Sequence, residues 1–309
     1  MKQDAKILIV GDRNLVGARL IHYFNEQRFT HIFGDSLCSL DAVDQHAVKS
    51  FFQKIQPDYV FLTHVKHGGI RANIRYPGEF TYYNLQVQTN IIHYSYMYNV
   101  KKLLFFASSC SYPKNSPQPI KEKYLLQDAL EKTSEQYAVA KIAGIQLCKA
   151  YNHQYGTHFM SLIPATTYGP EDHFDIDSGH VISSLIKKFH DAKVHNNATV
   201  TVWGSGNQRR EFIYVDDMIE ACIILMDHYD DNEIVNVGTG EDISVKDLAF
   251  LIKDSIGFKG EILFDTTQPE GPFQKLLDIT KLKTLGWSPK INLKEGIKLT
   301  YTWFSHNKV

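Results

Sequence analysis

A tyrosine and a lysine spaced four residues apart form the pair with the clearest chemistry in this sequence. Tyr137 and Lys141 would lie on one face of a helix, where residues i and i+4 are neighbours. An ammonium group favours the phenolate, so Lys141 is expected to lower the pKa of Tyr137 and to make it an acid and base near neutral pH. The same spacing occurs in Tyr98 and Lys102, but that pair joins an expected helix end to a strand start, and we give it no role.

A short polar run follows the apolar strand expected before that helix. Its first serine, Ser108, could hydrogen-bond a substrate oxygen opposite the tyrosine, and a Ser/Tyr/Lys group of this kind moves a proton while a hydride moves to or from nicotinamide. Serines at strand ends are also common turn residues. Cys110, taken alone, would more often be a buried apolar side chain. Together with a glycine turn near the start of the chain, these residues predict a dehydrogenase-like site.

That glycine turn is the candidate cofactor site. It follows the first expected strand and opens a helix, where glycines let the backbone approach a pyrophosphate that the helix N-terminus stabilises. Asn14 stands where the middle glycine of the pattern is usual. Asparagine tolerates left-handed dihedrals, but its side chain takes up space beside the phosphates. The residues predicted to contact the dinucleotide here are Gly11, Arg13, Asn14, Leu15, Val16 and Gly17.

The end of the second expected strand bears on the choice between NAD(H) and NADP(H). A carboxylate there binds the adenosine ribose hydroxyls of NAD, whereas an arginine accepts the 2′-phosphate of NADP. Asp35 therefore favours NAD, and no Arg or Lys occurs between Arg28 and Lys49. Arg13 could still reach a 2′-phosphate, and Asp35 is also a common type of turn residue, so the sequence leaves both cofactors open.

Alternating apolar runs and amphipathic stretches must position these side chains. In the first half they predict an α/β fold with a Rossmann-type doubly wound parallel sheet, its strands at 6–10, 31–34, 58–63, 102–107 and 158–163 and its helices at 15–27, 44–55, 80–98 and 134–155. Past Pro164 the rhythm changes to a helix at 180–193, strands near Thr199, Phe212 and 234–237, and helices near Val245 and Leu293.

The second half therefore reads as a smaller C-terminal substrate-binding α/β subdomain that covers the carboxyl ends of the sheet. We expect a dinucleotide-binding domain over residues 1–165 plus about 207–237, and a nucleotide-sugar-binding subdomain over 166–206 and 238–309.

Composition excludes some classes of partner. The 309 residues include 33 basic and 34 acidic ones, for a net charge of -1, which gives no electrostatic reason to expect nucleic acid or an anionic membrane as a partner. The four cysteines are far apart and predict no metal site or redox motif. Without a signal-like or membrane-spanning run, the sequence predicts a cytoplasmic protein.

Read together, the motifs resemble those of GDP-L-fucose synthases, a family of the extended short-chain dehydrogenase/reductase superfamily. The run Ser-Ser-Cys-Ser-Tyr-Pro-Lys at 108–114 and the segment with His180 are the most diagnostic. The resemblance covers nearly the whole chain and continues in the segments 135–144, 168–170, 178–182, 202–206, 210–212, 215–218, 236–240 and 275–278.

The resemblance implies a two-stage reaction on GDP-4-keto-6-deoxy-mannose. Cys110 would act as the base and His180 as the acid that epimerise C3 and C5, and Tyr137 would then donate a proton as NADPH reduces C4. A thiolate near a cation and an imidazole are suitable groups for these steps. Without the resemblance, His180 would often be only a side chain near a helix cap.

The resemblance also implies contacts and an assembly. Further cofactor contacts would come from Ala107, Ser108, Tyr137, Lys141, Pro164, Thr166 and His180. The GDP-linked sugar would be bound by Ser109, Lys188, Trp203, Arg210 and Asp278, with Arg209 as the alternative diphosphate contact and core packing as the alternative for Trp203. A homodimer would pack through the helices at 80–98 and 134–155.

Several residues depart from the family pattern. These are Asn14, the run 35–38 in place of an arginine-bearing segment, Thr63 and His64 in place of small residues, the run 164–167 without its asparagine, and Lys188 and Gln274 in place of arginines. They leave open an NAD-dependent enzyme that reduces, oxidises or epimerises another GDP-sugar, such as a GDP-heptose. A non-catalytic nucleotide-binding protein is the third possibility, which Ser108, Tyr137 and Lys141 argue against.

Overall fold

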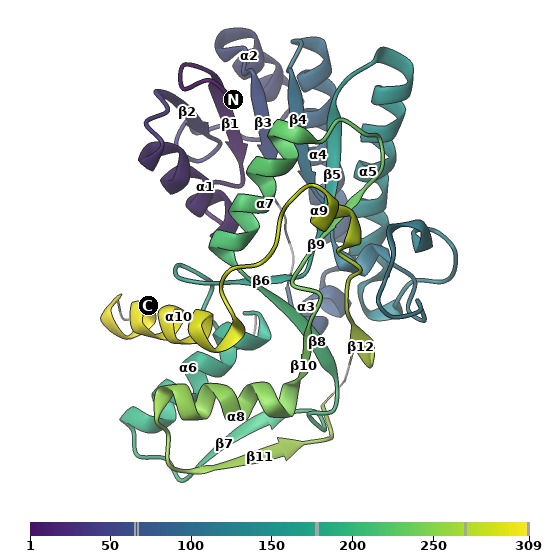
Figure 1. Cartoon of the computed structure of the whole chain (residues 1–309). Helices are drawn as coiled ribbons and strands as arrows, with labels where there is room; N and C mark the ends of the chain where they lie inside the picture. Colours follow the sequence, from purple (N-terminus) through teal and green to yellow (C-terminus); the bar gives the residue numbers. More distant parts are fainter. Residues whose placement is uncertain (65, 67, 177–178, 269–270, 308–309) are drawn as a thin grey trace.

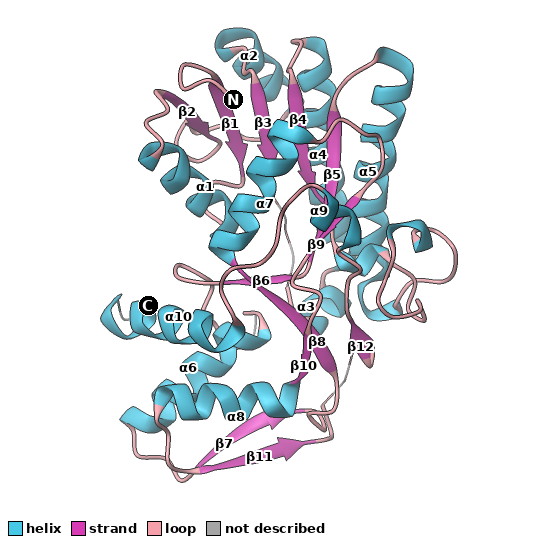
Figure 2. Cartoon of the chain, viewed as in Figure 1, coloured by secondary structure: helices cyan, strands magenta, loops and turns pink. Residues whose placement is uncertain are grey.

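A six-stranded parallel sheet forms the centre of the larger part of the chain in the computed structural model (Figures 1 and 2). The strand order is β2-β1-β3-β4-β5-β9, so the chain winds outward from β1 in both directions, as in a Rossmann fold. The strands are β1 (Lys6–Val10), β2 (His31–Gly34), β3 (Tyr59–Leu62), β4 (Lys102–Phe106), β5 (Phe159–Pro164) and β9 (Val235–Val237). The predicted fold class is confirmed.

The structure describes residues 1–64, 66, 68–176, 179–268 and 271–307. Ser178, which belongs to the expected histidine motif, lies outside them. Among the described residues, no helix combines the length and apolar character needed to cross a membrane.

Helices cover the sheet in two layers. Contacts join α2 (Gln45–Ile55) to α4 (Pro77–Met97) and α4 to α5 (Glu135–Tyr155), whereas α1 (Leu15–Glu26) contacts α7 (Val215–His228). The strands and helices predicted in the first half agree with these bounds to within a few residues. Tyr98 follows the last residue of α4 and Lys102 begins β4, as expected for that pair. The helix α7 and the short α3 (Ile70–Arg75) were not predicted from the sequence.

The smaller part of the chain contains two further sheets. Strand β8 (Arg209–Tyr214) pairs with β6 (Thr166–Tyr168), β10 (Asp242–Ser244) and β12 (Gln274–Lys275), and β7 (Thr199–Trp203) pairs with β11 (Glu261–Asp265). The helices here are α6 (Val181–Val194), α8 (Val245–Ile256) and α10 (Leu293–Asn307). This is the smaller α/β subdomain that the sequence predicts.

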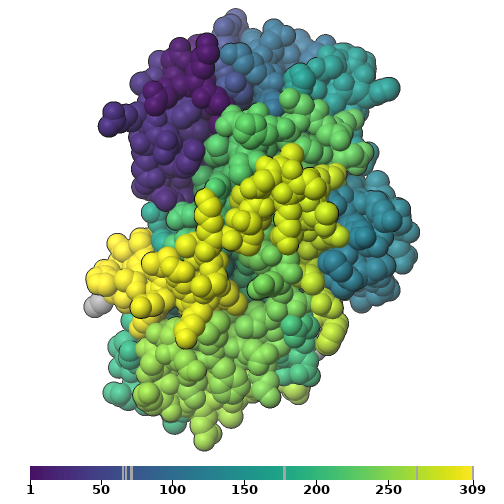
Figure 3. Space-filling model, in the orientation of Figure 1, coloured from purple at the N-terminus to yellow at the C-terminus, as the bar shows by residue number. Residues whose placement is uncertain are grey.

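Strand β8 connects the two hydrophobic cores. Ile213 belongs to the core of the main sheet, while its neighbours Phe212 and Tyr214 belong to the second core, because successive side chains of a strand point to opposite faces. The chain also returns to the first core after β12: Trp287, which follows α9 (Thr280–Thr284), is buried there. In the space-filling view this C-terminal segment crosses the junction of the two parts (Figure 3).

Candidate active site

The turn after β1 has glycine where no other residue would fit. Gly11 has a φ of +101°, and a Cβ there would lie 2.6 Å from the backbone nitrogen of His64. A Cβ at Gly17 would lie 2.0 Å from the carbonyl oxygen of Gly11. The turn thus closes tightly against β3 and opens α1, which is the arrangement that lets backbone approach a pyrophosphate. These residues fit a dinucleotide.

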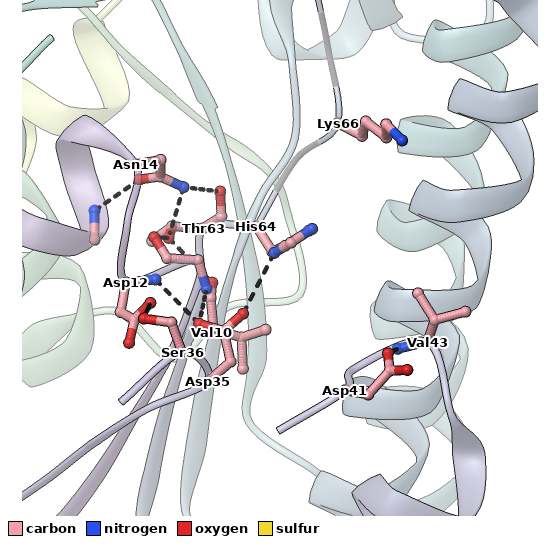
Figure 4. A network of polar contacts seen from close by, with 12 residues as sticks. Val10, Asp12, Asn14, Asp35, Ser36, Asp41, Val43, Thr63, His64 and Lys66 are labelled. Carbon is pink, nitrogen blue, oxygen red and sulfur yellow. Dashed lines mark hydrogen bonds and ion pairs between the residues drawn. The ribbon is translucent and has the colours of Figure 1, made fainter. Parts of the chain in front are cut away.

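Asn14 has a capping role in that turn. Its φ is −84°, so the position does not use the left-handed conformation that asparagine tolerates. The side-chain oxygen accepts a hydrogen bond from the backbone N–H of Gly17 at 2.8 Å, which caps α1. The side-chain nitrogen donates to the carbonyl oxygen of Thr63 at 2.9 Å (Figure 4). Asn14 therefore fastens the β1 turn to the end of β3.

Asp35 uses its carboxylate within the protein. Oδ1 accepts hydrogen bonds from the backbone N–H groups of Gly11 at 2.9 Å and Asp12 at 3.2 Å, and Oδ2 lies 3.5 Å from Nδ1 of His64 (Figure 4). Burial would raise its pKa, but the hydrogen bonds from His64, Gly11 and Asp12 lower it to about 2. The carboxylate is therefore charged and holds the glycine turn.

A second buried carboxylate lies beside it. Asp12 accepts a hydrogen bond from the backbone N–H of Leu37 at 3.0 Å and another from the hydroxyl of Ser36. A Cβ at Gly34 would collide with it, 2.0 Å from Oδ2. The end of β2 thus faces two carboxylates, of which the sequence singled out only Asp35.

Ser108 links the two reactive side chains of the site. It follows β4 and caps the short helix η1 (Ser109–Ser111), accepting a hydrogen bond from the backbone N–H of Cys110 at 3.2 Å. Its side chain also hydrogen-bonds the hydroxyl of Tyr137, in the first turn of α5. The structure therefore brings serine, cysteine and tyrosine together, as the motifs predict.

The expected lowering of the tyrosine pKa is not found. Burial raises the pKa of Tyr137, the charge of Cys110 raises it further, and the hydrogen bond from Ser108 only partly offsets them. Lys141 is 1% exposed and donates to the carbonyl oxygen of Phe106 at 2.9 Å, and burial lowers its pKa to about 7. The lysine is thus bound to the end of β4.

Cys110 has a cationic partner that sequence reasoning missed. Nζ of Lys275, in β12, lies 3.4 Å from its Sγ. Burial raises the pKa of the thiol, but the charge of Lys275 and hydrogen bonds from Ser108, Ser134 and Lys275 outweigh it, so that the pKa lies below its ordinary value. The signal was present, since Lys275 opens one of the quoted motifs.

His180 occupies the N-cap position of α6. A Cβ at the preceding Gly179 would lie 2.4 Å from the carbonyl oxygen of Asp175, so the chain can reach this helix start only through glycine. The histidine interacts electrostatically with Asp172, which is 7% exposed. Burial raises the pKa of Asp172, and His180 opposes that rise. The histidine therefore faces a buried acid.

The residues expected to bind the nucleotide come from the smaller part. Nζ of Lys188 lies 4.8 Å from the ring centroid of Trp203, whose side chain is 36% exposed, so core packing does not account for this tryptophan. Arg209 is bound by Asp242 through two nitrogens, at 2.8 and 2.7 Å. Gln274, where an arginine is usual, donates to the same carboxylate at 2.6 Å.

Arg210 and Asp278 also have internal contacts. Arg210 donates to the carbonyl oxygen of Arg209 at 2.7 Å. Asp278 accepts a hydrogen bond from the backbone N–H of Thr280 at 2.9 Å. The other predicted contact residues lie at strand ends or helix starts on the same edge of the main sheet; they are Arg13, Leu15, Val16, Ala107, Ser109, Pro164 and Thr166.

Glu211 is a buried carboxylate that sequence reasoning did not assign. It is 3% exposed and accepts hydrogen bonds from the backbone N–H groups of Gly240 at 2.7 Å and Leu277 at 2.8 Å. A Cβ at Gly238 would lie 2.2 Å from its Oε1, which explains the first glycine of the 236–240 motif. Burial raises the pKa of Glu211 to about 7 even though these hydrogen bonds oppose the rise.

Comparison with known proteins agrees with this geometry. The NAD dependent epimerase/dehydratase family matches residues 7–238. The chain is 46% identical to GDP-L-fucose synthase 1 of Arabidopsis thaliana, covering 99% of this chain and 94% of that protein. It is 41% identical to the GDP-L-fucose synthase of Escherichia coli K12, covering 98% and 97%. A GDP-mannoheptose C4 reductase from Campylobacter jejuni with NADP bound matches with a TM-score of 0.90 at 38% identity, covering 99% of each chain.

The dinucleotide turn, the Ser/Tyr/Lys group and the family match define the class of protein. The chain belongs to the NAD dependent epimerase/dehydratase family, whose members are extended short-chain dehydrogenases/reductases. Within it, full-length identities above 40% place the chain among the GDP-L-fucose synthases. The resemblance inferred from the motifs is confirmed.

The raised pKa of Glu211 predicts a pH-dependent stability. The carboxyl group ionises near pH 4.5 in the unfolded chain and near 7 in the folded one. Its protonated form therefore stabilises the fold below about pH 4.5, and that contribution is lost as the pH rises through 7. The wild-type free energy of unfolding, measured in urea, should therefore be lower at pH 8 than at pH 5. The Glu211→Gln substitution should make this difference about 2 kcal/mol smaller.

The exposed neighbour provides the control. Glu241→Gln should keep the wild-type difference between the two pH values. Glu211→Gln should also be less stable at both, because an amide has a single acceptor oxygen for the two N–H groups. A Glu211→Gln protein with the full wild-type pH dependence would contradict this assignment.

Proposed function

We propose that this enzyme epimerises C3 and C5 and then reduces C4 of a GDP-4-keto-6-deoxy sugar, using NADH or NADPH. The observation that carries the proposal is that Ser108 hydrogen-bonds both Cys110 and Tyr137, which brings a readily ionised thiol and a protonated phenol into one site. The GDP-L-fucose synthases to which the chain is similar support the substrate class.

The side chains divide the proton transfers between them. Cys110 removes the proton from a carbon next to the ketone, and His180 donates a proton to the opposite side of that carbon, which inverts it. Tyr137 then donates its proton to the C4 oxygen, which Ser108 holds by a hydrogen bond. A reduced nicotinamide dinucleotide held by the glycine turn would supply the hydride that C4 receives.

Two sets of residues would hold the ligands. The glycine turn, with Gly11, Arg13, Asn14, Leu15, Val16 and Gly17, would bind the dinucleotide together with Asp35, Ala107, Pro164 and Thr166. In the smaller part, Arg210 would pair with the diphosphate and Trp203 would offer an apolar surface to the nucleotide. Ser109, Lys188 and Asp278 would complete the sugar-nucleotide contacts. We propose the division into residues 1–165 plus about 207–237 and residues 166–206 plus 238–309 as a functional one, with the exception of β8, which carries Arg210 and pairs with β6, β10 and β12.

The adenosine end of the cofactor site favours NADH. The carboxylates of Asp12 and Asp35 are both buried at the end of β2, and Asp35 is ionised above a pH of about 2. A dianionic 2′-phosphate would be repelled there. Arg13 and the NADP bound to the related heptose reductase support NADPH instead, so the two cofactors need a direct comparison.

A second candidate function is the reduction of a GDP-heptose at C4 without the full epimerisation. The match to the GDP-mannoheptose C4 reductase supports it. The contact of Cys110 with Lys275 favours the combined epimerase and reductase function, because a reduction alone does not require a thiolate base.

Two substitutions separate the stages of the proposed reaction. With GDP-4-keto-6-deoxy-mannose, Tyr137→Phe should slow the oxidation of NADH or NADPH, followed at 340 nm, by about 10²–10⁴-fold, because the C4 oxygen loses its acid. The same variant should retain deuterium exchange from D₂O into C3 and C5. Cys110→Ser should lose that exchange. Tyr76→Phe, on an exposed tyrosine, is the control, and a wild-type rate in Tyr137→Phe would defeat the proposal.

An arginine placed at the end of β2 should change the cofactor preference. Wild-type kcat/KM should be higher with NADH than with NADPH. Ser36→Arg should raise the ratio for NADPH over NADH by about ten- to hundredfold, since a hydrogen bond to a charged group contributes about 1.5–3 kcal/mol. Ser36→Ala controls for the lost contact with Asp12. An unchanged ratio in Ser36→Arg would place the ribose elsewhere.

We also propose that the protein works in the cytoplasm as a homodimer. Helices α4 and α5 pack together and expose large apolar side chains, namely Tyr82, Met97, Val139 and Tyr155. A second copy would cover these faces. Sedimentation equilibrium should give twice the mass of the chain, and Tyr82→Glu should shift the protein toward monomer; a monomeric wild type would refute the dimer.

A further inference from the structure

Cys110 lies in a polar recess that three distant segments build. Cys110 lies within η1, Glu131 caps the short helix η3 (Lys132–Ser134) that precedes α5, and Lys275 comes from β12. We propose that Lys275 is the positioning residue that stabilises the thiolate form of Cys110. This inference rests on the proposed function, in which Cys110 is the base that removes the proton next to the ketone.

Contact geometry is the first support. Nζ of Lys275 donates to Sγ of Cys110 at 3.4 Å, across 165 positions of the sequence. A buried thiol in apolar surroundings stays protonated, and only a nearby cation or hydrogen-bond donors reverse that preference. Cys110 is half-buried, so the ammonium group of Lys275 acts on it with less screening than at the surface.

The hydroxyl groups beside the sulfur cannot replace the lysine. Ser108 and Ser134 both hydrogen-bond Cys110. Ser108, however, also hydrogen-bonds Tyr137, and a hydroxyl has one hydrogen to donate. The protonated phenol can donate to Ser108 while Ser108 donates to the sulfur, but a neutral hydroxyl adds no positive charge beside the thiolate. An ammonium group carries three donors and a full charge, so Lys275 supports the thiolate whichever way Ser108 points.

The other charged groups around the sulfur largely cancel. Lys114 and Glu131 line the same recess and form an ion pair at 3.2 Å. Tyr137 faces Cys110 from α5 with its phenol protonated. Glu131 also feels the charge of Lys275, but its hydrogen bond is with Lys114. Among the described residues that line the recess, the net charge directed at the sulfur is thus that of Lys275.

The strand that carries Lys275 also connects the base to the nucleotide. In the pairing of β12 with β8, Lys275 lies opposite Arg210. Residues opposite each other on neighbouring strands share a face of the sheet. The residue that activates the thiol and the residue proposed to pair with the diphosphate are therefore held in one register, so a sugar tethered by its diphosphate would be presented near Cys110.

The proton transfer balances without a further reactant. The thiolate takes the proton, the carbon–hydrogen bond breaks and a sulfur–hydrogen bond forms, and the electron pair moves onto the ketone oxygen as an enolate. Lys275 takes no part in this transfer. Its effect is on how readily the sulfur ionises, which sets the fraction of enzyme ready to act at a given pH.

The test follows the ionisation of Cys110 in the full-length protein without substrate or cofactor. Alkylation by iodoacetamide is measured from pH 5 to 10 by mass spectrometry of the peptide that contains Cys110. In the wild type the midpoint should lie below the ordinary thiol pKa of about 8.5. In Lys275→Met it should rise by at least one unit, so that alkylation at a pH below both midpoints falls about tenfold or more.

Matched variants separate charge from structure. Lys275→Arg should keep a low midpoint because the charge remains, and Lys132→Met, on an exposed lysine, should match the wild type in alkylation and activity. A wild-type midpoint at or above 8.5, or an unchanged midpoint in Lys275→Met, would overturn the inference. The wild-type and Lys275→Arg measurements decide it even if Lys275→Met does not fold.

Two readouts keep this inference distinct from the proposed function. A low midpoint that depends on Lys275, in a protein that turns over no GDP-sugar, would uphold the inference about the thiol and reject the proposed function. Turnover of the GDP-sugar, together with an alkylation midpoint that does not depend on Lys275, would uphold the proposed function and reject the inference about the thiol. If both hold, Lys275→Met should shift the pH profile of deuterium exchange at C3 and C5 to higher pH while Lys275→Arg leaves it in place.

Discussion

Parallel strands of one sheet bring their carboxyl ends to a common edge, and the reacting groups depend on that constraint. Strand β1 ends at the glycine turn, β2 at Asp35, β3 at Thr63 and β4 at Ser108. Helix α5 starts from the same edge, so Tyr137 in its first turn reaches the hydroxyl of Ser108. The smaller subdomain then adds Lys275 to this edge through β12. Chain segments far apart in sequence thereby share one small volume.

Burial at this edge gives the reactive groups different affinities for a proton. Burial raises the pKa of Tyr137, so the phenol holds its proton until an oxyanion forms beside it. Burial also raises the pKa of the half-buried Cys110, but the positive charge of Lys275 at contact distance and nearby hydrogen bonds outweigh it, so that its pKa is lowered. In the proposed reaction, an ionisable thiol beside a protonated phenol would separate the base from the acid, so that one site could run two opposite proton transfers.

The departures from the family pattern compensate one another. Asn14 replaces a glycine of the turn, and its side chain donates a hydrogen bond to Thr63, which also departs from the family pattern. Asp35 likewise lies beside His64, which replaces a small residue. Gln274 donates to the carboxylate of Asp242, which also binds Arg209. Each of these unusual side chains thus has a polar partner within the protein. The glycine turn keeps its shape, while the charge at the end of β2 differs from the family pattern.

The sequence alone determined much of the main sheet and the residues of the candidate site. Alternating apolar runs fixed the order and bounds of the first five strands, because strand and helix periodicities are local properties, and the motifs around Ser108, Tyr137 and Lys141 identified the site and the family. The strands β7 and β8 were foreseen near Thr199 and Phe212, whereas helix α7 and the short strands β6, β10, β11 and β12 were not. The sign of the Tyr137 pKa shift was predicted wrongly, since a spacing of four residues reveals neither burial nor that Lys141 binds the carbonyl oxygen of Phe106. The partnerships of Cys110 with Lys275, Asp35 with His64 and Glu211 with Gly240 were decided only by the tertiary structure, because each joins segments whose distance in space depends on how the sheets pack.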